Sequence, residues 1–184
     1  MVKIDIGQEG IFELLYPALV VLVTSIGKEK KPNVLTIAWS TPTSFDPPMV
    51  AISISPERYS YNLIDQTKEF AINIPDRTLM KQILICGTMS GRDADKFKRS
   101  KLTPVRSRKI KPPIIKECIA HLECKTVDKI KTGDHFLIVG EVVAAYADED
   151  SFDRKRYAIE HIQPLLHLQD GPHVFTVPSE LISP

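Results

Sequence analysis

Several features that define large classes of protein are scarce in this 184-residue sequence. Three cysteines, Cys86, Cys118 and Cys124, are too few and odd in number for a disulfide framework, so reduced thiols are expected. The formal net charge is only +1, which gives no overall field to attract nucleic acid or an anionic membrane. No apolar run approaches the roughly 18–20 residues that span a bilayer, and residues 1–10 lack the apolar core of a secretory signal. These absences predict a cytoplasmic protein that binds neither nucleic acid nor membrane.

The composition is that of an ordinary globular protein. Hydrophobic residues make up 43% and charged residues 26% of the chain, which is typical of a domain with a packed core. No repeat or low-complexity linker divides the sequence. We therefore expect one domain over residues 1–184.

Alternating and β-branched runs predict a mainly β fold with a few helices. Strands are expected at 17–26, 34–40, 49–55, 69–75, 121–127 and 135–147. Gly140 interrupts the last run and indicates a bulge or bend. Short helices are expected at 11–17, 60–70, 77–87 and 93–102, with Ser60 as the N-cap of the second and Gly87 ending the third. Long strands with few helices favour a closed barrel over a doubly wound sheet.

The expected strand 34–40 has two contrasting faces. Leu35, Ile37 and Trp39 alternate onto one face, which predicts core packing for the only tryptophan of the chain. The other face carries only small side chains, so its backbone is open to a flat ligand. The chain continues with further Ser and Thr hydroxyls among three prolines, which is unusual for a buried strand.

A second stretch, 49–62, is typical of a phosphate site without a glycine loop. Ser53 and Ser55 lie on the small-residue face of a strand, Arg58 follows in a turn, and Ser60 opens a helix. A helix N-terminus offers unpaired N–H groups, and a guanidinium adds charge-assisted hydrogen bonds. The alternative is that Ser60 only caps the helix and Arg58 is a solvated turn residue.

Four blocks of sequence occur in one order and together carry a family resemblance. They are NVLTIAWSTPTSFDPPMVAISISPERYSYNLI, EFAINIP, CGTMSGRDADKF and GDHFLIVGEV. In combination they resemble the flavin reductase-like proteins with an FMN-binding split barrel, especially the flavoredoxin and ferric-reductase-like members. The resemblance runs from about Tyr16 to Leu168. It implies a Greek-key split barrel and a homodimer with one FMN per subunit near the interface.

The resemblance also implies positions for the cofactor. For the isoalloxazine ring these are Thr36, Ala38, Trp39, Ser40 and Thr41. For the ribityl phosphate they are Ser53, Ser55, Arg58 and Ser60, with Asn62 and Thr67 as lesser candidates. The block CGTMSGRDADKF adds Cys86, Gly87, Thr88, Ser90 and Lys96 near the flavin. Taken alone, Cys86 after an apolar run is typical of a small buried residue.

Two histidines complete the expected site. His135 opens the strand 135–147 where similar proteins have a histidine near the flavin and the nicotinamide, and we assign it a catalytic role. By itself, a histidine at a strand start is usually structural. His167 is expected to lie beside the ring. Hydride transfer belongs to the cofactors, so the protein supplies geometry and electrostatics.

The function implied is an NAD(P)H-dependent, FMN-containing reductase. Its electrons would pass to free flavin, a ferric complex or a partner redox protein. A flavoredoxin-like electron carrier that does not oxidise NAD(P)H is the main alternative, and a flavin-binding protein without turnover is another.

Two further patterns received other interpretations. Cys118, His121 and Cys124 have a spacing that would suit a metal on a helix, but on a strand His121 points away from the thiols, so no metal site is expected. The basic segment 96–111 is interpreted as a solvated loop, or as a surface that attracts a phosphate-rich dinucleotide such as NADPH.

Overall fold

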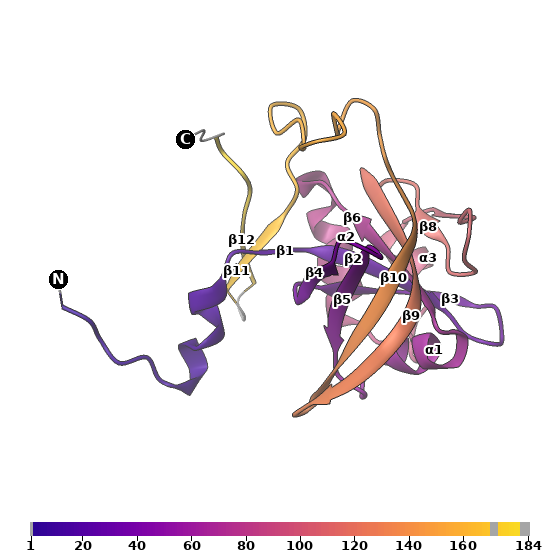
Figure 1. Cartoon of the computed structure of the whole chain (residues 1–184), viewed down its shortest axis with the longest axis horizontal. Helices are drawn as coiled ribbons and strands as arrows, with labels where there is room; N and C mark the ends of the chain where they lie inside the picture. Colours follow the sequence, from indigo (N-terminus) through magenta and orange to yellow (C-terminus); the bar gives the residue numbers. More distant parts are fainter. Residues whose placement is uncertain (1, 170–172, 181–184) are drawn as a thin grey trace.

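The computed structural model describes residues 2–169 and 173–180, and its main feature is a strongly curled antiparallel sheet (Figure 1). Its seven strands run in the order β3-β2-β6-β9-β10-β5-β4. Their bounds are β2 Val21–Ile26, β3 Pro32–Ile37, β4 Ser40–Ser44, β5 Met49–Ile54, β6 Glu69–Ile74, β9 Ala120–Thr132 and β10 His135–Ala147. The edge strands β3 and β4 are not paired with one another, so the barrel is split. The expected mainly β split barrel is confirmed.

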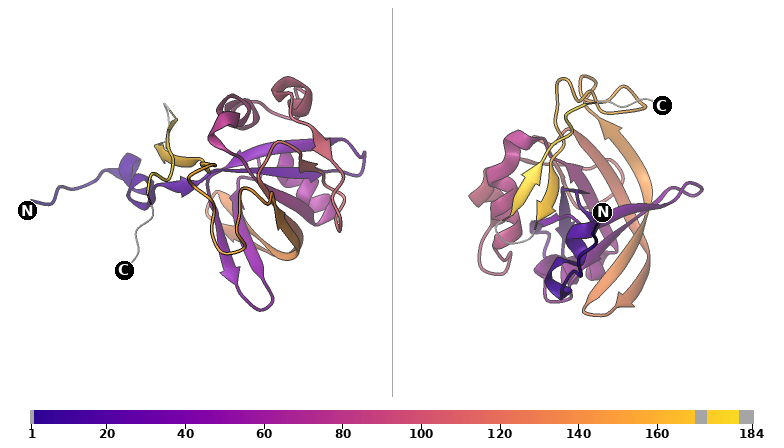
Figure 2. Two further views of the ribbon diagram at one scale, coloured as in Figure 1. Left: turned by 90° about the horizontal axis from the view of Figure 1, so that it is seen from above. Right: turned by 90° about the vertical axis from the view of Figure 1, so that its left-hand side faces the viewer.

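Smaller elements surround this sheet. A three-stranded sheet joins β1 (Ala18–Leu19), β11 (Leu166–Gln169) and β12 (Val174–Thr176), and β7 (Pro104–Val105) pairs with β8 (Ile114–Ile115). The helices are α1 (Tyr59–Thr67), α2 (Met80–Thr88) and α3 (Lys96–Ser100), with 3-10 turns η1 (Gln8–Gly10), η2 (Phe12–Leu15) and η3 (Arg77–Leu79). The N-terminal residues extend away from the barrel (Figure 2). Within the described ranges, no helix has the length and apolar character needed to cross a membrane.

Two apolar clusters hold the fold together. The larger one fills the barrel and includes Val23, Ile52, Phe70 and Ile138, with Ile64 of α1 closing one side. The other lies between the outer face of β2–β3 and the helices α2 and α3. Because β2 is buried on both faces, its residues do not alternate: Val21, Leu22 and Val23 are consecutive buried apolar residues, and Thr24 and Ser25 are buried after them.

The strand positions predicted from the sequence are largely confirmed, with one informative error. The expected strand 34–40 ends at Ile37, and a new strand begins at Ser40. The prediction that Trp39 packs in the core is wrong, because the chain breaks alternation there and leaves the side chain 36% exposed. The backbone carbonyl of Trp39 instead accepts a hydrogen bond of 2.9 Å from the N–H of Ser53.

The helix predictions are correct in place but not always in detail. Residues 11–17 form a 3-10 turn rather than an α-helix. Ser60 is not the N-cap of α1, since Arg58 holds that position without a side-chain cap. The Ser60 hydroxyl is buried and accepts a 2.7 Å hydrogen bond from Asn33 Nδ2. Helix α2 ends one residue beyond Gly87.

An irregularity occurs at Gly140 as expected, but the bulged residue lies on the partner strand. Val139 pairs with Asp128 and Gly140 with Thr126, which leaves Val127 of β9 as the extra residue. A Cβ atom at Gly140 would lie 2.7 Å from Cζ of Phe70, so the glycine also permits close packing against the core.

Candidate functional site

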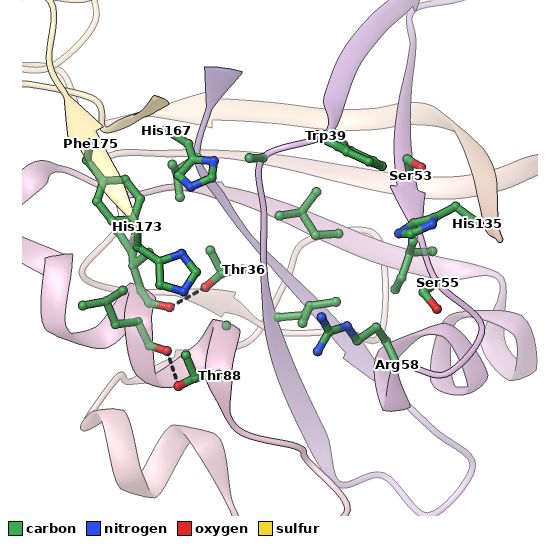
Figure 3. Close-up of a pocket in the computed structure, with 18 of the residues that line it drawn as sticks. Thr36, Trp39, Ser53, Ser55, Arg58, Thr88, His135, His167, His173 and Phe175 are labelled. Atoms are coloured by element: carbon green, nitrogen blue, oxygen red, sulfur yellow. Dashed lines mark hydrogen bonds between the residues drawn. The ribbon is translucent and has the colours of Figure 1, made fainter. Parts of the chain in front are cut away.

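A cavity of about 570 Å³ lies where β3, β5, α2, β10 and the β11–β12 hairpin meet (Figure 3). Of the predicted site residues, those that line it are Thr36, Ala38, Trp39, Ser53, Ser55, Arg58, Gly87, Thr88, His135 and His167. They come from four separated segments of sequence, so the fold brings together most of the predicted site.

Aromatic rings form two groups around this cavity. In one, the indole of Trp39 lies 5.3 Å from the His135 ring and 5.2 Å from the Phe12 ring, between centroids. In the other, the His167 ring lies 5.2 Å from both Tyr16 and Phe175. Trp39 Nε1 donates a 3.2 Å hydrogen bond to the Tyr16 hydroxyl and so links the groups. The rings leave faces and edges suited to a flat, conjugated ligand.

Two threonine hydroxyls of the cavity are already engaged within the protein. The Thr36 hydroxyl donates to the Ile83 carbonyl at 2.6 Å, and the Thr88 hydroxyl donates to the Leu84 carbonyl at 2.7 Å. Their oxygens therefore face a ligand as acceptors rather than donors. Gly87 lies against Thr36, where a Cβ would be only 3.4 Å from the threonine Cβ.

A second cavity of about 480 Å³ continues from the first, and its lining contains three cations, Arg58, Arg92 and Lys96, beside two acidic residues, Glu57 and Asp134. The residues common to both linings are Leu35, Ser55, Arg58, Thr88 and His135. The second cavity adds three predicted residues, Ser60, Ser90 and Lys96, together with Arg92. The guanidinium of Arg58 points into the space between the strands in Figure 3, so it lies at the boundary of an aromatic and a cationic compartment.

Lys96 is the most buried cation of the site. Its side chain is 3% exposed, and Nζ donates a 2.7 Å hydrogen bond to the Cys86 carbonyl. Burial, together with the positive charge of Arg58, lowers the pKa of Lys96 to about 8. An anion that enters the cavity therefore interacts favourably with this buried ammonium.

Some predicted residues line neither cavity. These are Ser40, Thr41, Asn62, Thr67 and Cys86. Thr67 donates to the Leu63 carbonyl within α1, and Asn62 is exposed on the same helix. Cys86 is a small buried residue, whose thiol pKa burial raises to about 11; only its carbonyl faces Lys96.

Sequence reasoning passed over several residues of the site. Arg92 lies in the block CGTMSGRDADKF but was not singled out, and its guanidinium donates to the Glu57 carbonyl at 2.8 Å. Gly91 was also overlooked. Only a glycine fits at this position, because a Cβ there would lie 2.2 Å from Asn33 Oδ1. Tyr16, His173 and Phe175 also line the first cavity, and nothing in their local pattern marks them.

Apart from Lys96, which opens the basic segment and lines the second cavity, neither of the two remaining patterns contributes to this site. His121 Nδ1 lies 2.9 Å from Asn73 Oδ1, on the opposite face of β9 from Cys124, and the described residues contain no group of three metal-ligating side chains. In the basic segment, Arg108 lies over the Tyr146 ring at 3.8 Å, and Glu123 accepts hydrogen bonds from the N–H groups of Arg108 and Lys109. The loop is thereby anchored on β9 and β10, away from both cavities.

Comparison with known proteins agrees with this architecture. Residues 14–175 match the model of the family described as flavin reductase like domain. An uncharacterized protein of Archaeoglobus fulgidus is 38% identical over 175 residues, which is 95% of this chain and 97% of that protein. A flavin reductase of Pseudomonas putida is 28% identical over 127 residues, 69% of this chain and 71% of that one.

Solved structures give the same result. The flavoredoxin of Methanosarcina acetivorans superposes with a TM-score of 0.88 at 25% identity, covering 100% of this chain and 95% of that one. An FMN-binding protein of Thermus thermophilus with bound p-hydroxybenzaldehyde gives a TM-score of 0.85 at 25% identity, covering 100% and 99%. The family match over nearly the whole chain, on a split barrel with these adjoining cavities, shows that the protein belongs to the flavin reductase-like domain family.

Proposed function

We propose that the protein binds FMN and acts as an NAD(P)H-dependent flavin or ferric reductase. The observation that carries this proposal is the pair of adjoining cavities, one walled by aromatic rings and one that gathers three cations and several hydroxyls beside two carboxylates, with Arg58 at their boundary. A planar ring system joined to a phosphate has the same two-part chemistry.

The residues present fit FMN in both compartments. A volume of about 570 Å³ lies within the range of roughly 300–1,000 Å³ found for small-molecule sites. In the cationic cavity, the described residues give the Lys96 ammonium only one hydrogen-bond acceptor, the Cys86 carbonyl, although it has three donors. No side chain caps α1, so its first N–H groups add to the charge of Arg58, Arg92 and Lys96. These groups would hold the phosphate, and Ser55, Ser60 and Ser90 would add hydroxyls.

Bound FMN supplies the redox chemistry, since it accepts a hydride and passes electrons onward. The chain supplies position. His135 Nδ1 lies 2.8 Å from Asp134 Oδ1, and this contact lowers the pKa of Asp134. The carboxylate thus fixes the orientation of the imidazole, whose ring also lies against Trp39. In this proposal His135 orients the nicotinamide beside the ring, and the walls of the cavity exclude water.

The electron acceptor defines the second candidate function. Free flavin, a ferric complex and a partner redox protein all suit a reductase. A flavoredoxin-like carrier, which holds FMN but takes no hydride from NAD(P)H, is favoured by the TM-scores of 0.88 to two flavoredoxins.

A homodimer is part of the proposal. The N-terminal arm, residues 2–16, extends from the barrel in Figure 1 and exposes apolar side chains. Among them are Ile11, Phe12, Leu14 and Leu15, each between 48% and 78% exposed. An apolar arm of this kind is typical of a surface that a second subunit covers.

Two measurements test the proposal in sequence. The visible absorption spectrum of the purified protein is recorded, then recorded again after addition of FMN and desalting, with riboflavin as the control ligand. Retention of FMN in preference to riboflavin supports the site. Anaerobic stopped-flow mixing of the FMN-loaded protein with NADH or NADPH follows. Rapid bleaching supports the reductase, a retained but unbleached flavin supports the carrier, and failure to bind any flavin contradicts both.

A further inference from the structure

The β9–β10 hairpin extends beyond the rest of the sheet. Strand β9 pairs with β6 only as far as Lys125, opposite Glu69, and then continues to Thr132. Beyond Lys125, β10 is its only neighbouring strand. The register shift at Val139 and Gly140 leaves a bulge at Val127, where this overhang begins. We call residues 127–136 the hairpin end.

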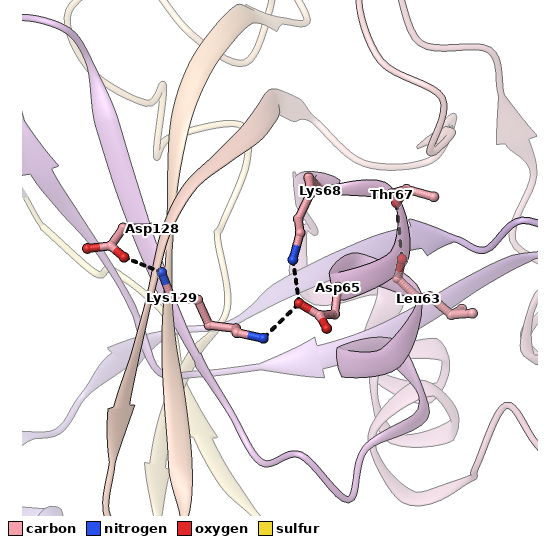
Figure 4. Close-up of polar contacts among 6 residues, drawn as sticks. All are labelled: Leu63, Asp65, Thr67, Lys68, Asp128 and Lys129. Atoms are coloured by element: carbon pink, nitrogen blue, oxygen red, sulfur yellow. Dashed lines mark hydrogen bonds and ion pairs between the residues drawn. The ribbon is translucent and has the colours of Figure 1, made fainter.

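The hairpin end is fastened to α1 by a small cluster (Figure 4). Lys129 Nζ lies 2.8 Å from Asp65 Oδ1, and the same ammonium is 5.4 Å from the Tyr61 ring centroid and 5.5 Å from that of Phe136. The Tyr61 and Phe136 rings are themselves 5.1 Å apart. The ammonium of Lys129 holds the pKa of Asp65 below its usual value, with a smaller contribution from Lys68. We call Tyr61, Asp65, Lys129 and Phe136 the clasp.

The clasp lies on one face of the hairpin and His135 on the other. Neighbouring residues of a strand point to opposite faces, so Phe136 turns toward α1 while His135 turns toward the cavities. There the His135 ring lies 5.3 Å from Trp39. Helix α1 also begins directly after Arg58, so the clasp connects the element that presents Arg58 with the element that presents His135.

We propose that Lys129 is a positioning residue, which holds the hairpin end on α1 and thereby places His135 against Trp39 at the mouth of the cavity. The functional meaning of this placement rests on the proposed function, whereas the placement itself does not. Lys129 and Asp65 have side chains 31% and 38% exposed, so the clasp lies outside the packed core. Loss of an exposed ion pair and of a cation–π contact should raise the opening equilibrium of the hairpin end about 5- to 30-fold.

The test compares four variants of the protein without added flavin. Lys129→Met removes the ammonium from the clasp, Lys129→Arg keeps its charge, Lys68→Met is the matched control, and His135→Ala is the reference for Trp39 without its histidine neighbour. The Lys68 ammonium forms a 2.5 Å ion pair with the same Asp65 oxygen. The Lys68 backbone carbonyl accepts a 2.8 Å hydrogen bond from the N–H of Thr126 on β9, which the substitution of the side chain leaves in place. Amide hydrogen exchange of residues 130–136 measures opening, and fluorescence of the only tryptophan, Trp39, reports on its contact with His135.

Lys129→Met is expected to accelerate exchange at the hairpin end about 5- to 30-fold and to shift Trp39 emission toward that of His135→Ala. Lys129→Arg and Lys68→Met are expected to resemble the wild type. Equal exchange rates in Lys129→Met and Lys68→Met, or unchanged Trp39 emission in Lys129→Met, would overturn the proposal. A thermal unfolding midpoint close to that of the wild type confirms that each variant is folded.

A second readout uses FMN-loaded protein. Lys129→Met should slow flavin reduction by NAD(P)H while FMN affinity changes by less than about twofold, because the cations Arg58, Arg92 and Lys96 are untouched. A parallel loss of affinity would show that the clasp supports the whole site rather than His135. If the wild type binds no flavin, the proposed function fails, but the exchange and emission results still decide the role of the clasp.

Discussion

Substitution of Lys96 by methionine should increase the stability of the folded protein and weaken its binding of FMN. The buried ammonium costs free energy in the folded protein, because its pKa falls from 10.5 to about 8. At about 1.4 kcal/mol per pKa unit, this corresponds to roughly 3 kcal/mol at neutral pH. Removing the charge would therefore stabilise the variant by that amount. Loss of the hydrogen bond to the Cys86 carbonyl offsets about 1.5–3 kcal/mol of this stabilisation. Lys96→Met is therefore expected to raise the free energy of unfolding by about 1 kcal/mol.

The pH dependence of the free energy of unfolding provides an independent test of the Lys96 prediction. Between pH 8 and 10.5 the unfolded chain keeps a proton on Lys96 that the folded protein has released, so the stability of the wild type rises with pH in this window. This contribution is absent from Lys96→Met. Urea unfolding at pH 7, 9 and 10 measures the difference, and Lys98→Met, an exposed position on the same helix, is the control.

Cofactor binding should change in the other direction. Loss of a charge-assisted contact with the phosphate weakens FMN binding about 10- to 150-fold and leaves riboflavin nearly unaffected. In the wild type, FMN affinity should fall above about pH 8 as Lys96 loses its charge. Titration by flavin fluorescence measures both ligands. A variant that is less stable than the wild type, or that loses FMN and riboflavin affinity equally, would refute the reasoning.

Three further predictions follow from the same structure. Arg58→Ala should weaken FMN binding about 10- to 150-fold and riboflavin binding much less; unchanged FMN affinity would remove Arg58 from the phosphate site. Burial lowers the pKa of His121 to about 4, so stability present above the usual histidine pKa, about 6.5, is lost as pH falls toward 4. The loss should reach about 3 kcal/mol, and urea midpoints at pH 7 and 4.5 should differ less in His121→Gln. If the proposed dimer forms, joint replacement of Phe12 and Leu15 by serine should convert it to a monomer in sedimentation velocity, and a monomeric wild type would contradict the proposed assembly.

The elements that the sequence predicted best are those whose pattern is local. Strand 135–147 was predicted with the bounds that the structure shows, because its residues form one long run that is mostly apolar. Trp39 was misplaced because its turn depends on a hydrogen bond from Ser53, which belongs to another strand. Strands β11 and β12 were missed, since β11 pairs with β1 across most of the chain.

The site residues that the sequence predicted best are also those marked by a local pattern. Arg58, Lys96 and His135 lie in the cavities because short motifs place them at the ends of elements. Ser60 was wrongly predicted as the N-cap of α1, because its hydroxyl accepts a hydrogen bond from Asn33, 27 residues earlier. Contacts of this kind depend on the folded arrangement and leave no mark on the neighbouring sequence.

One wall of the first cavity, formed by His167 of β11 and Phe175 of β12, comes from the end of the sequence, so the site is assembled in a defined order. All seven strands of the barrel come from residues 21–147, whereas this wall comes from 166–176 and rests on β1. During synthesis the barrel strands leave the ribosome before the wall does. The cavity is therefore complete only when the last described strands have docked, and a nascent barrel has an open half-site until then. Flavin retention would then report on the docking of the C-terminal strands, an event separate from the folding of the barrel.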